Sequence, residues 1–151
     1  MITDSSRYYG SVIHRIVEAS NVSVSIARLD VTVPGFFLLN DRLPFYVKYS
    51  TARKGPWGFN FHVSQRSLLD DYRTRFGECL SVLVCAKDGM VTLSYSDLES
   101  VLEDRGETQE NVSVKRGHRE MYEVKGPGGA LDHKVARNSL LLALDTSLRG
   151  A

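Results

Sequence analysis

Residues 79–86 (CLSVLVCA) form an almost unbroken apolar run, and this run restricts the fold more than any other feature of the sequence. A strand that is apolar on both sides is typical of a sheet buried on both faces. The turn sequence Lys87-Asp88-Gly89 leads into a second strand-like segment over residues 90–95, so the two segments predict a β-hairpin. The chain therefore needs a sheet with other elements packed against it.

Apolar residues at helical or strand spacing predict the remaining elements. Helical spacing predicts helices over residues 6–19, 64–76 and 134–148, with a short helix after Ser96. Alternation or short apolar runs predict strands over residues 21–33, 36–39, 44–50, 57–63, 112–115 and 121–124, whereas residues 103–110 have a loop composition. This order predicts an α/β (α+β) fold in which a single mixed sheet is flanked by helices.

Length and composition restrict the class of protein. A chain of 151 residues has the usual size of one domain, so residues 1–151 are expected to form a single domain. Apolar residues make up 42% and charged residues 25%, which argues against a disordered, fibrous or membrane protein. No segment approaches the roughly 20 apolar residues of a membrane span, and residues 1–10 lack the apolar stretch of a signal peptide. A cytoplasmic location is therefore expected.

The formal net charge of +1 hides an uneven distribution of charge along the chain. Residues 1–77 hold ten Lys or Arg against six Asp or Glu, whereas residues 78–151 hold nine against twelve. The first half thus carries the excess positive charge that binding to a polyanion needs. The alternative interpretation is that these are solvated charges on ordinary surface elements.

Several motifs of well-defined chemistry are missing from the sequence. It contains no phosphate loop, no dinucleotide-binding glycine motif, and none of the zinc-protease, C-x-x-C and nucleophile-elbow motifs. The histidines are dispersed, and none lies near a cysteine at zinc-ligand spacing. Two segments remain as candidates for a site, residues 33–36 (VPGF) and residues 45–49 (FYVKY).

The order helix, three-strand meander, helix and strand around these segments resembles the core of the PD-(D/E)xK phosphodiesterase superfamily, which includes restriction enzymes and Holliday-junction resolvases. The resemblance covers about residues 6–95 and implies a restriction-endonuclease-like core, followed by a C-terminal extension over about residues 96–151. In that superfamily an acid opens the second strand, an acid-x-Lys triplet lies on the third, and the first helix often supplies a glutamate. The carboxylates hold Mg²⁺, and the lysine positions and activates the attacking water.

Residue by residue, only the lysine of this motif is present. Lys48 matches it, but Tyr46 stands at the position of the triplet acid. Gly35 stands at the position of the aspartate, and His14 at that of the helix glutamate. A phenol, with a pKa near 10, does not replace a carboxylate as a ligand of a hard cation at neutral pH. The resemblance therefore implies a Mg²⁺ site that is displaced or lost.

A displaced site would place carboxylate oxygens near Lys48. The candidate metal ligands are Asp41, Asp30 and Glu18, and the candidate catalytic residues are Lys48 and Asp41. Two of these residues also have a structural interpretation. Asp41 fits a tight turn in which its side chain bonds the local backbone, and Lys48 fits an ordinary strand lysine with its amine in water.

Polyanion contact is predicted around the loop that follows Lys48, because basic side chains bind phosphates and an exposed aromatic ring stacks on a base. The candidate nucleic-acid-binding residues are Arg53, Lys54, Trp57 and Arg66. Trp57, Phe59 and Phe61 share one face of their strand, which favours the core for all three, and Trp57, at the strand edge, is the candidate for exposure. A second basic segment, residues 115–119, lies in a predicted hairpin turn and has a solubilising interpretation.

These observations predict a nuclease-like domain that binds nucleic acid, with DNA rather than RNA as the expected partner. If the domain is active, it would be a metal-dependent endonuclease. The alternative is a non-enzymatic regulatory or protein-interaction domain, which would form a homodimer or bind another protein through its C-terminal leucines. These are Leu140, Leu142, Leu144 and Leu148, and an exposed apolar patch over them would indicate such an interface.

Overall fold

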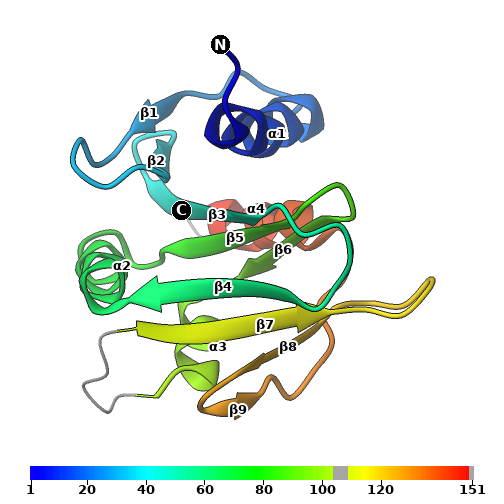
Figure 1. Cartoon of the computed structure of the whole chain (residues 1–151). Helices are drawn as coiled ribbons and strands as arrows, with labels where there is room; N and C mark the ends of the chain where they lie inside the picture. The colour runs from blue at the N-terminus through cyan, green and yellow to red at the C-terminus, as the bar shows by residue number, and fades with distance from the viewer. Residues whose placement is uncertain (104–108, 150–151) are drawn as a thin grey trace.

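The computed structural model describes residues 1–103 and 109–149, and it has the predicted α+β class (Figure 1). The helices are α1 (Asp4–Ala19), α2 (Val63–Phe76), α3 (Tyr95–Val101) and α4 (Ser139–Arg149). The strands are β1 (Ile26–Arg28), β2 (Phe36–Leu39), β3 (Leu43–Ser50), β4 (Trp57–His62), β5 (Leu80–Cys85), β6 (Gly89–Leu93), β7 (Gln109–Lys115), β8 (Glu123–Gly126) and β9 (Gly129–Ala130). Within the described ranges, no helix has both the length and the apolar character of a membrane span.

The first sheet has the strand order β1-β2-β3-β5-β6. β1, β2 and β3 form an antiparallel meander, β3 and β5 are parallel, and β6 returns antiparallel to β5. Every residue of β5 is buried, as its apolar run predicts. The core order of helix, meander, helix and strand, which the resemblance implies, is therefore present, with β4 inserted before α2.

The described strands divide between two sheets, where the sequence predicts a single one. The second sheet has the order β4-β7-β8-β9, and its neighbouring strands are antiparallel. β4 does not continue the meander beside β3, because residues 51–56 carry the chain into a second layer (Figure 1). Along β4, Trp57, Phe59 and Phe61 are buried while the residues between them are exposed, so one side of the strand faces the core.

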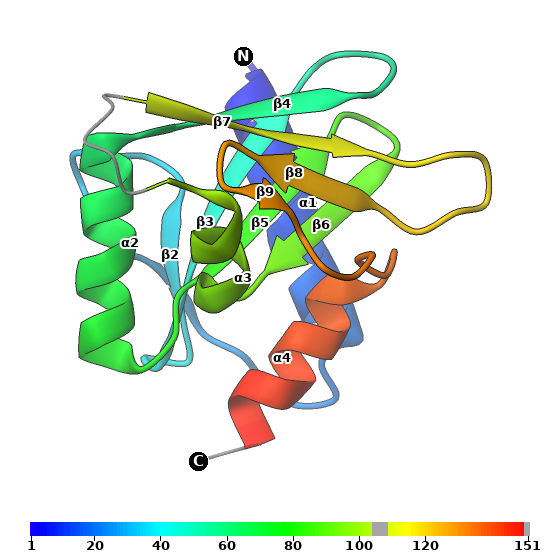
Figure 2. The same cartoon turned by 90° about the horizontal axis from the view of Figure 1, so that it is seen from below.

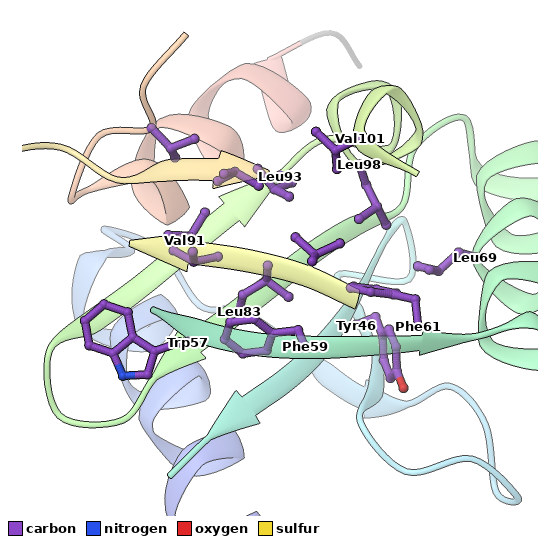
Figure 3. Close-up of a cluster of buried hydrophobic side chains, with 14 of the residues drawn as sticks. Tyr46, Trp57, Phe59, Phe61, Leu69, Leu83, Val91, Leu93, Leu98 and Val101 are labelled. Carbon is purple, nitrogen blue, oxygen red and sulfur yellow. The ribbon is translucent and has the colours of Figure 1, made fainter. Parts of the chain in front are cut away.

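The first sheet is covered on both faces. α1 and α4 lie against one face, where Ile16 and Leu140 pack on residues of β3 and β5. The second sheet, α2 and α3 cover the other face, and in Figure 2 the second sheet lies in front of the first with α1 behind it. Figure 3 shows β4 side chains facing Leu83 and Val91 of the first sheet, with Leu98 of α3 closing the core. The C-terminal extension thus supplies part of the same core.

Several elements differ in extent from their prediction. β1 is much shorter than the predicted strand over residues 21–33, because the Asp30 side chain bonds the backbone of Thr32 and turns the chain. α4 begins at Ser139 instead of residue 134, because Val135 pairs with Tyr122 in an isolated bridge. Of the predicted loop over residues 103–110, residues 104–108 lie outside the described residues, and β7 begins directly after them.

Candidate nucleic-acid interface

Lys48 lies near the end of β3, with its amine between the first sheet and β4. Nζ donates to Gln65 Oε1 at 3.2 Å and lies 3.5 Å from the Tyr46 hydroxyl. It is also 5.2 Å from the ring centroids of Tyr46 and Phe61. Burial lowers the pKa of Lys48 to about 8. Lys48 is therefore covered by β4 and the start of α2, and its amine is not in open water.

Asp41 lies far from Lys48, because the two residues are at opposite ends of β3. Asp41 is exposed in the turn between β2 and β3, in the left-handed region at φ 56°. β3 begins at Leu43, and at roughly 3.3 Å per residue the strand from there to Lys48 spans about 16 Å. The structure thus does not bring Asp41 and Lys48 together into a shared site.

The other two candidate metal ligands have local partners. Asp30 Oδ1 accepts hydrogen bonds from the backbone N–H groups of Val33 and Thr32, at 3.0 and 2.8 Å. The bond from Val33, followed by those from Thr32, lowers the pKa of Asp30 to about 2. Glu18 is exposed in the last turn of α1, where its carboxylate lies 3.1 Å from His14 Nε2. Asp30 therefore stabilises a turn, and Glu18 pairs along its own helix.

Two positions of the missing motif acids, 35 and 46, lie in closely packed surroundings. Gly35 has φ +96°, and a Cβ there would lie 2.8 Å from the Val47 carbonyl oxygen and 3.1 Å from the Tyr46 ring. Tyr46 is buried and stacks on Phe36, with ring centroids 3.9 Å apart. A carboxylate side chain therefore has no room at position 35.

Residues 1–103 and 109–149 contain no group of three or more His, Cys, Asp or Glu side chains that could hold a metal ion. Mg²⁺ requires near-octahedral coordination by oxygen ligands. The described residues therefore do not fit the Mg²⁺ that the resemblance implies. The predicted ligand set of Asp41, Asp30 and Glu18 does not form such a group either.

Arg53 and Lys54 are exposed in the loop between β3 and β4, as its basic composition predicts. Trp57 closes this loop, because its indole N–H donates to the Ala52 carbonyl at 2.9 Å. Only 4% of Trp57 is exposed, and its ring packs edge-on against Tyr122. The predicted base-stacking role of Trp57 is therefore corrected: β4 directs the ring inward, and it anchors the loop.

The second basic segment lies against this loop. β4 pairs with β7 in a register that places Trp57 opposite Val114, so the loop before β4 lies beside the hairpin that follows Lys115. The two segments line an open hollow of about 840 Å³. Its basic lining residues are Arg53, Lys54, Lys115, Arg116 and His118.

Three loops meet at this end of the molecule: residues 51–56, residues 86–89 between β5 and β6, and residues 115–121 (Figure 1). We call them the three-loop end. They hold six Lys or Arg and two Asp or Glu, a net charge of +4, so the rest of the chain carries −3 of the total of +1. The positive field therefore comes from both halves of the sequence and not from the first half alone.

Arg66 lies at the opposite end of the second sheet. Nη1 donates to the Glu103 carbonyl at 3.0 Å and lies 3.4 Å from Glu110 Oε2. The two side chains of this ion pair are only 17% and 3% exposed. Glu110 is opposite Phe61, whereas the hollow lies near Trp57 at the other end of β4. Arg66 therefore joins α2 to β7, which corrects its predicted role in nucleic-acid binding.

The C-terminal leucines belong mostly to the core. Leu140 and Leu144 are buried against the first sheet, and Leu148 packs beside them. Leu142 is 52% exposed. The exposed patch over the four leucines that would indicate an interface is thus not formed, and homodimerisation stays a prediction.

Comparisons with known proteins assign no family to the chain. No family model matches it, and a search of curated proteins finds no match. Among solved structures, it is similar to Hjc, a Holliday junction resolvase from the archaeal hyperthermophile Archaeoglobus fulgidus, with a TM-score of 0.48 and 12% sequence identity. The similarity covers 72% of this chain and 87% of that one. A likeness at this level carries no argument about function.

Proposed function

We propose that the protein binds nucleic acid at the three-loop end, mainly through contacts with the phosphate backbone. The observation that carries this proposal is the convergence of two basic segments, about 60 residues apart in the chain, on one open hollow. Arg53 and Lys54 line it from one side, and Lys115 and His118 from the other. Basic side chains grouped around a concave surface are the electrostatic footprint of a polyanion site.

The excess of positive charge among the lining residues of the hollow supports an anionic ligand. Asp88 is the carboxylate in its lining, and Arg116 pairs with that carboxylate at 2.7 Å. Within residues 1–103 and 109–149, no ion pair includes Arg53 or Lys54. A ligand can therefore meet these two exposed cations without first breaking an ion pair between described residues.

The burial of Trp57 determines the mode of binding. It is the aromatic residue in the lining of the hollow, and its face is covered by the core. Recognition by base stacking needs an exposed ring, whereas recognition of phosphates needs only placed cations. Binding is therefore expected to rest on contacts with the phosphate backbone of the nucleic acid. DNA is the expected partner, and RNA serves as a competitor in the test.

The function that the site supports is binding and not metal-dependent cleavage. Gly35 and Tyr46 stand where the resemblance places two carboxylates. At position 35 the Val47 carbonyl and the Tyr46 ring leave no space for a side chain, and at position 46 a phenol stacked on Phe36 takes the place of the acid. Lys48, the one motif residue present, lies under β4 with Gln65 as its hydrogen-bond acceptor. These features support a nuclease-like domain whose Mg²⁺ site is lost.

Fluorescence anisotropy with a labelled DNA duplex tests the proposal. We expect the affinity to fall steeply between about 50 and 200 mM NaCl, because phosphate contacts release condensed counterions. Replacing Arg53→Ala and Lys54→Ala together should weaken binding roughly tenfold and lower the log–log salt slope by about 2. RNA of the same sequence, as a competitor, distinguishes the two kinds of nucleic acid.

The matched control removes two positive charges elsewhere. Arg28 on β1 and Arg75 on α2 are exposed. β1 and α2 lie on the side of the molecule opposite the three-loop end (Figure 1). The double variant Arg28→Ala with Arg75→Ala should bind almost as well as the wild type. An affinity that does not change with the salt concentration, or an equal loss of affinity in both double variants, would contradict a phosphate-binding site at the three-loop end.

A further inference from the structure

We infer that Asp88 is a positioning residue that holds the basic hairpin over residues 115–121 in place for nucleic-acid contact. This inference rests on the proposed function and goes beyond it. Asp88 carries the wrong charge for a phosphate site, so its place in the hollow needs a reason. The geometry gives that reason, because a single carboxylate joins both arms of the hairpin to the turn between β5 and β6.

The Asp88 carboxylate has three donors, and they come from the two sides of the hairpin. Before the hairpin turn, Arg116 Nε donates to Oδ2 at 2.7 Å and Nη2 to Oδ1 at 2.8 Å. After it, the Tyr122 hydroxyl donates to Oδ2 at 2.6 Å. A bidentate arginine–carboxylate pair is among the strongest polar contacts in proteins and also fixes orientation. We call this group the Asp88 clamp.

The Arg116 side of the hairpin depends on the clamp because the ladder of backbone hydrogen bonds between β7 and β8 stops before it. The paired residues of β7 and β8 end at Lys115 and Glu123, and the loop between them projects beyond both sheets (Figure 2). Beyond that last pair, the Glu120 N–H donates to the Gly117 carbonyl at 3.1 Å, a bond within the loop itself. On the far side of the turn, backbone bonds between Tyr122 and Val135 and an ion pair between Glu120 and Lys134 also hold the hairpin. The clamp therefore attaches the near side, at Arg116, to the body of the molecule.

The turn that presents Asp88 is shaped for this contact. Ala86 is in the left-handed region at φ 48°, and its N–H donates to the Ser50 carbonyl at the start of the basic loop. Gly89 has φ 154°, and a Cβ there would lie 2.5 Å from the Tyr122 hydroxyl. A side chain at position 89 would therefore push that hydroxyl off the carboxylate. All three loops of the three-loop end meet at this turn.

For the substitution Asp88→Asn, a positioning role and charge alone predict opposite changes in the affinity for nucleic acid. Asp88→Asn removes a negative charge from a basic hollow, so charge alone predicts tighter binding of a polyanion. If the clamp positions the hairpin, the same change frees the hairpin, and the cost of ordering it again on binding weakens the complex. Arg116 holds the pKa of Asp88 below its usual range, so the carboxylate is charged at neutral pH.

The experiment measures duplex affinity by anisotropy for three variants at fixed salt. We expect Asp88→Asn to weaken binding roughly five- to tenfold and Tyr122→Phe, which leaves the charge unchanged, roughly two- to threefold. The control Asp71→Asn removes the same charge from an exposed position on α2 and should bind as well as the wild type. Trypsin should also cleave Asp88→Asn faster than the wild type after Arg116 or Arg119.

Each outcome has a definite meaning. Melting temperatures show whether Asp88→Asn is folded, and Tyr122→Phe keeps the core volume, so it tests the clamp if the first variant unfolds. Asp88→Asn that is folded and binds as tightly as Asp71→Asn, or more tightly, overturns the inference while leaving the proposed function intact. A wild type that does not bind the duplex refutes the proposed function, and the inference falls with it. In that case, faster tryptic cleavage would show only that the clamp orders the hairpin.

Discussion

At Lys48 the protein places an ammonium group where few groups compensate its charge. Its neighbours are one amide oxygen and two aromatic rings, and no ion pair within residues 1–103 and 109–149 includes it. Burial disfavours the charged form of a lysine, which is why the pKa of Lys48 falls to about 8 from its ordinary value of 10.5. At neutral pH the folded protein therefore bears the cost of a half-buried charge.

We expect Lys48→Met to raise the stability of the protein at pH 7 by about 1 kcal/mol, because it removes this cost and keeps the side-chain volume. The folded protein releases the Lys48 proton near pH 8 and the unfolded chain near pH 10.5, so the wild type gains stability between these values. The advantage of the variant, complete below pH 8, should therefore shrink as the pH rises.

Thermal unfolding followed by circular dichroism at several pH values measures this effect. The expected gain corresponds to about 2 to 4 °C at neutral pH. Lys54→Met, which makes the same substitution at an exposed position, is the control. A gain for Lys48→Met that stays constant up to pH 10.5 would mean that the charge of Lys48 is not its cause.

For some residues of the site the position follows from the neighbouring sequence, and for others it depends on distant parts of the chain. The exposure of Arg53 and Lys54 could be predicted, because loop composition is a local property. The places of Trp57 and Arg66 could not, because each depends on strand pairing between distant parts of the chain. The partner of Arg66, Glu110, reaches it only through the pairing of β4 with β7. No feature of the separate basic segments indicates that they meet.

At the scale of elements, periodicity predicted the strands better than it predicted their partners. The alternation in β4 shows that one side of the strand is buried, but it does not say which surface covers that side. The sequence therefore does not reveal that β4 leaves the first sheet. For β1, alternation predicts a strand longer than the one observed. The side chain of Asp30 forms local hydrogen bonds with the backbone, and these bonds compete with strand pairing.

The entry into β2 provides a test at this scale. Gly35 extends the pairing of β2 with β3, since its carbonyl accepts from the Val47 N–H at 2.8 Å. Its φ of +96° and its tight surroundings both disfavour a side chain. We expect Gly35→Ala to lower the free energy of unfolding by about 2 kcal/mol or more, measured by urea denaturation.

A second glycine serves as the control for this substitution. Gly10 lies within α1, and a Cβ there would meet nothing within 4 Å. Gly10→Ala should therefore raise the free energy of unfolding by about 0.5 to 1 kcal/mol, through helix propensity alone. A neutral effect of Gly35→Ala would show that the space beside Tyr46 is not closed, and a carboxylate at position 35 would then be feasible.

At the scale of the whole molecule, the core between the two sheets joins residues from most of the chain. Phe36, Phe61, Leu98, Val114 and Val135 all belong to it. A core shared in this way predicts that the two sheets unfold together as a single domain.

Two probes that report different parts of the molecule test this prediction. The chain has one tryptophan, Trp57, whose fluorescence reports the interior between the sheets. Far-ultraviolet circular dichroism is dominated by the helices, including α1 and α4 on the other face. The two urea transitions should have the same midpoint. Two separate midpoints would indicate that the sheets unfold independently.

The net charge of +4 at the three-loop end, against −3 elsewhere, gives this nearly neutral molecule a permanent electric dipole. A dipole in the field of a polyanion rotates as it approaches, so encounters begin with the positive pole in front. Changing a charge far from the three-loop end would thus alter the rate at which the proposed nucleic-acid partner is captured, without adding or removing a contact at the proposed site.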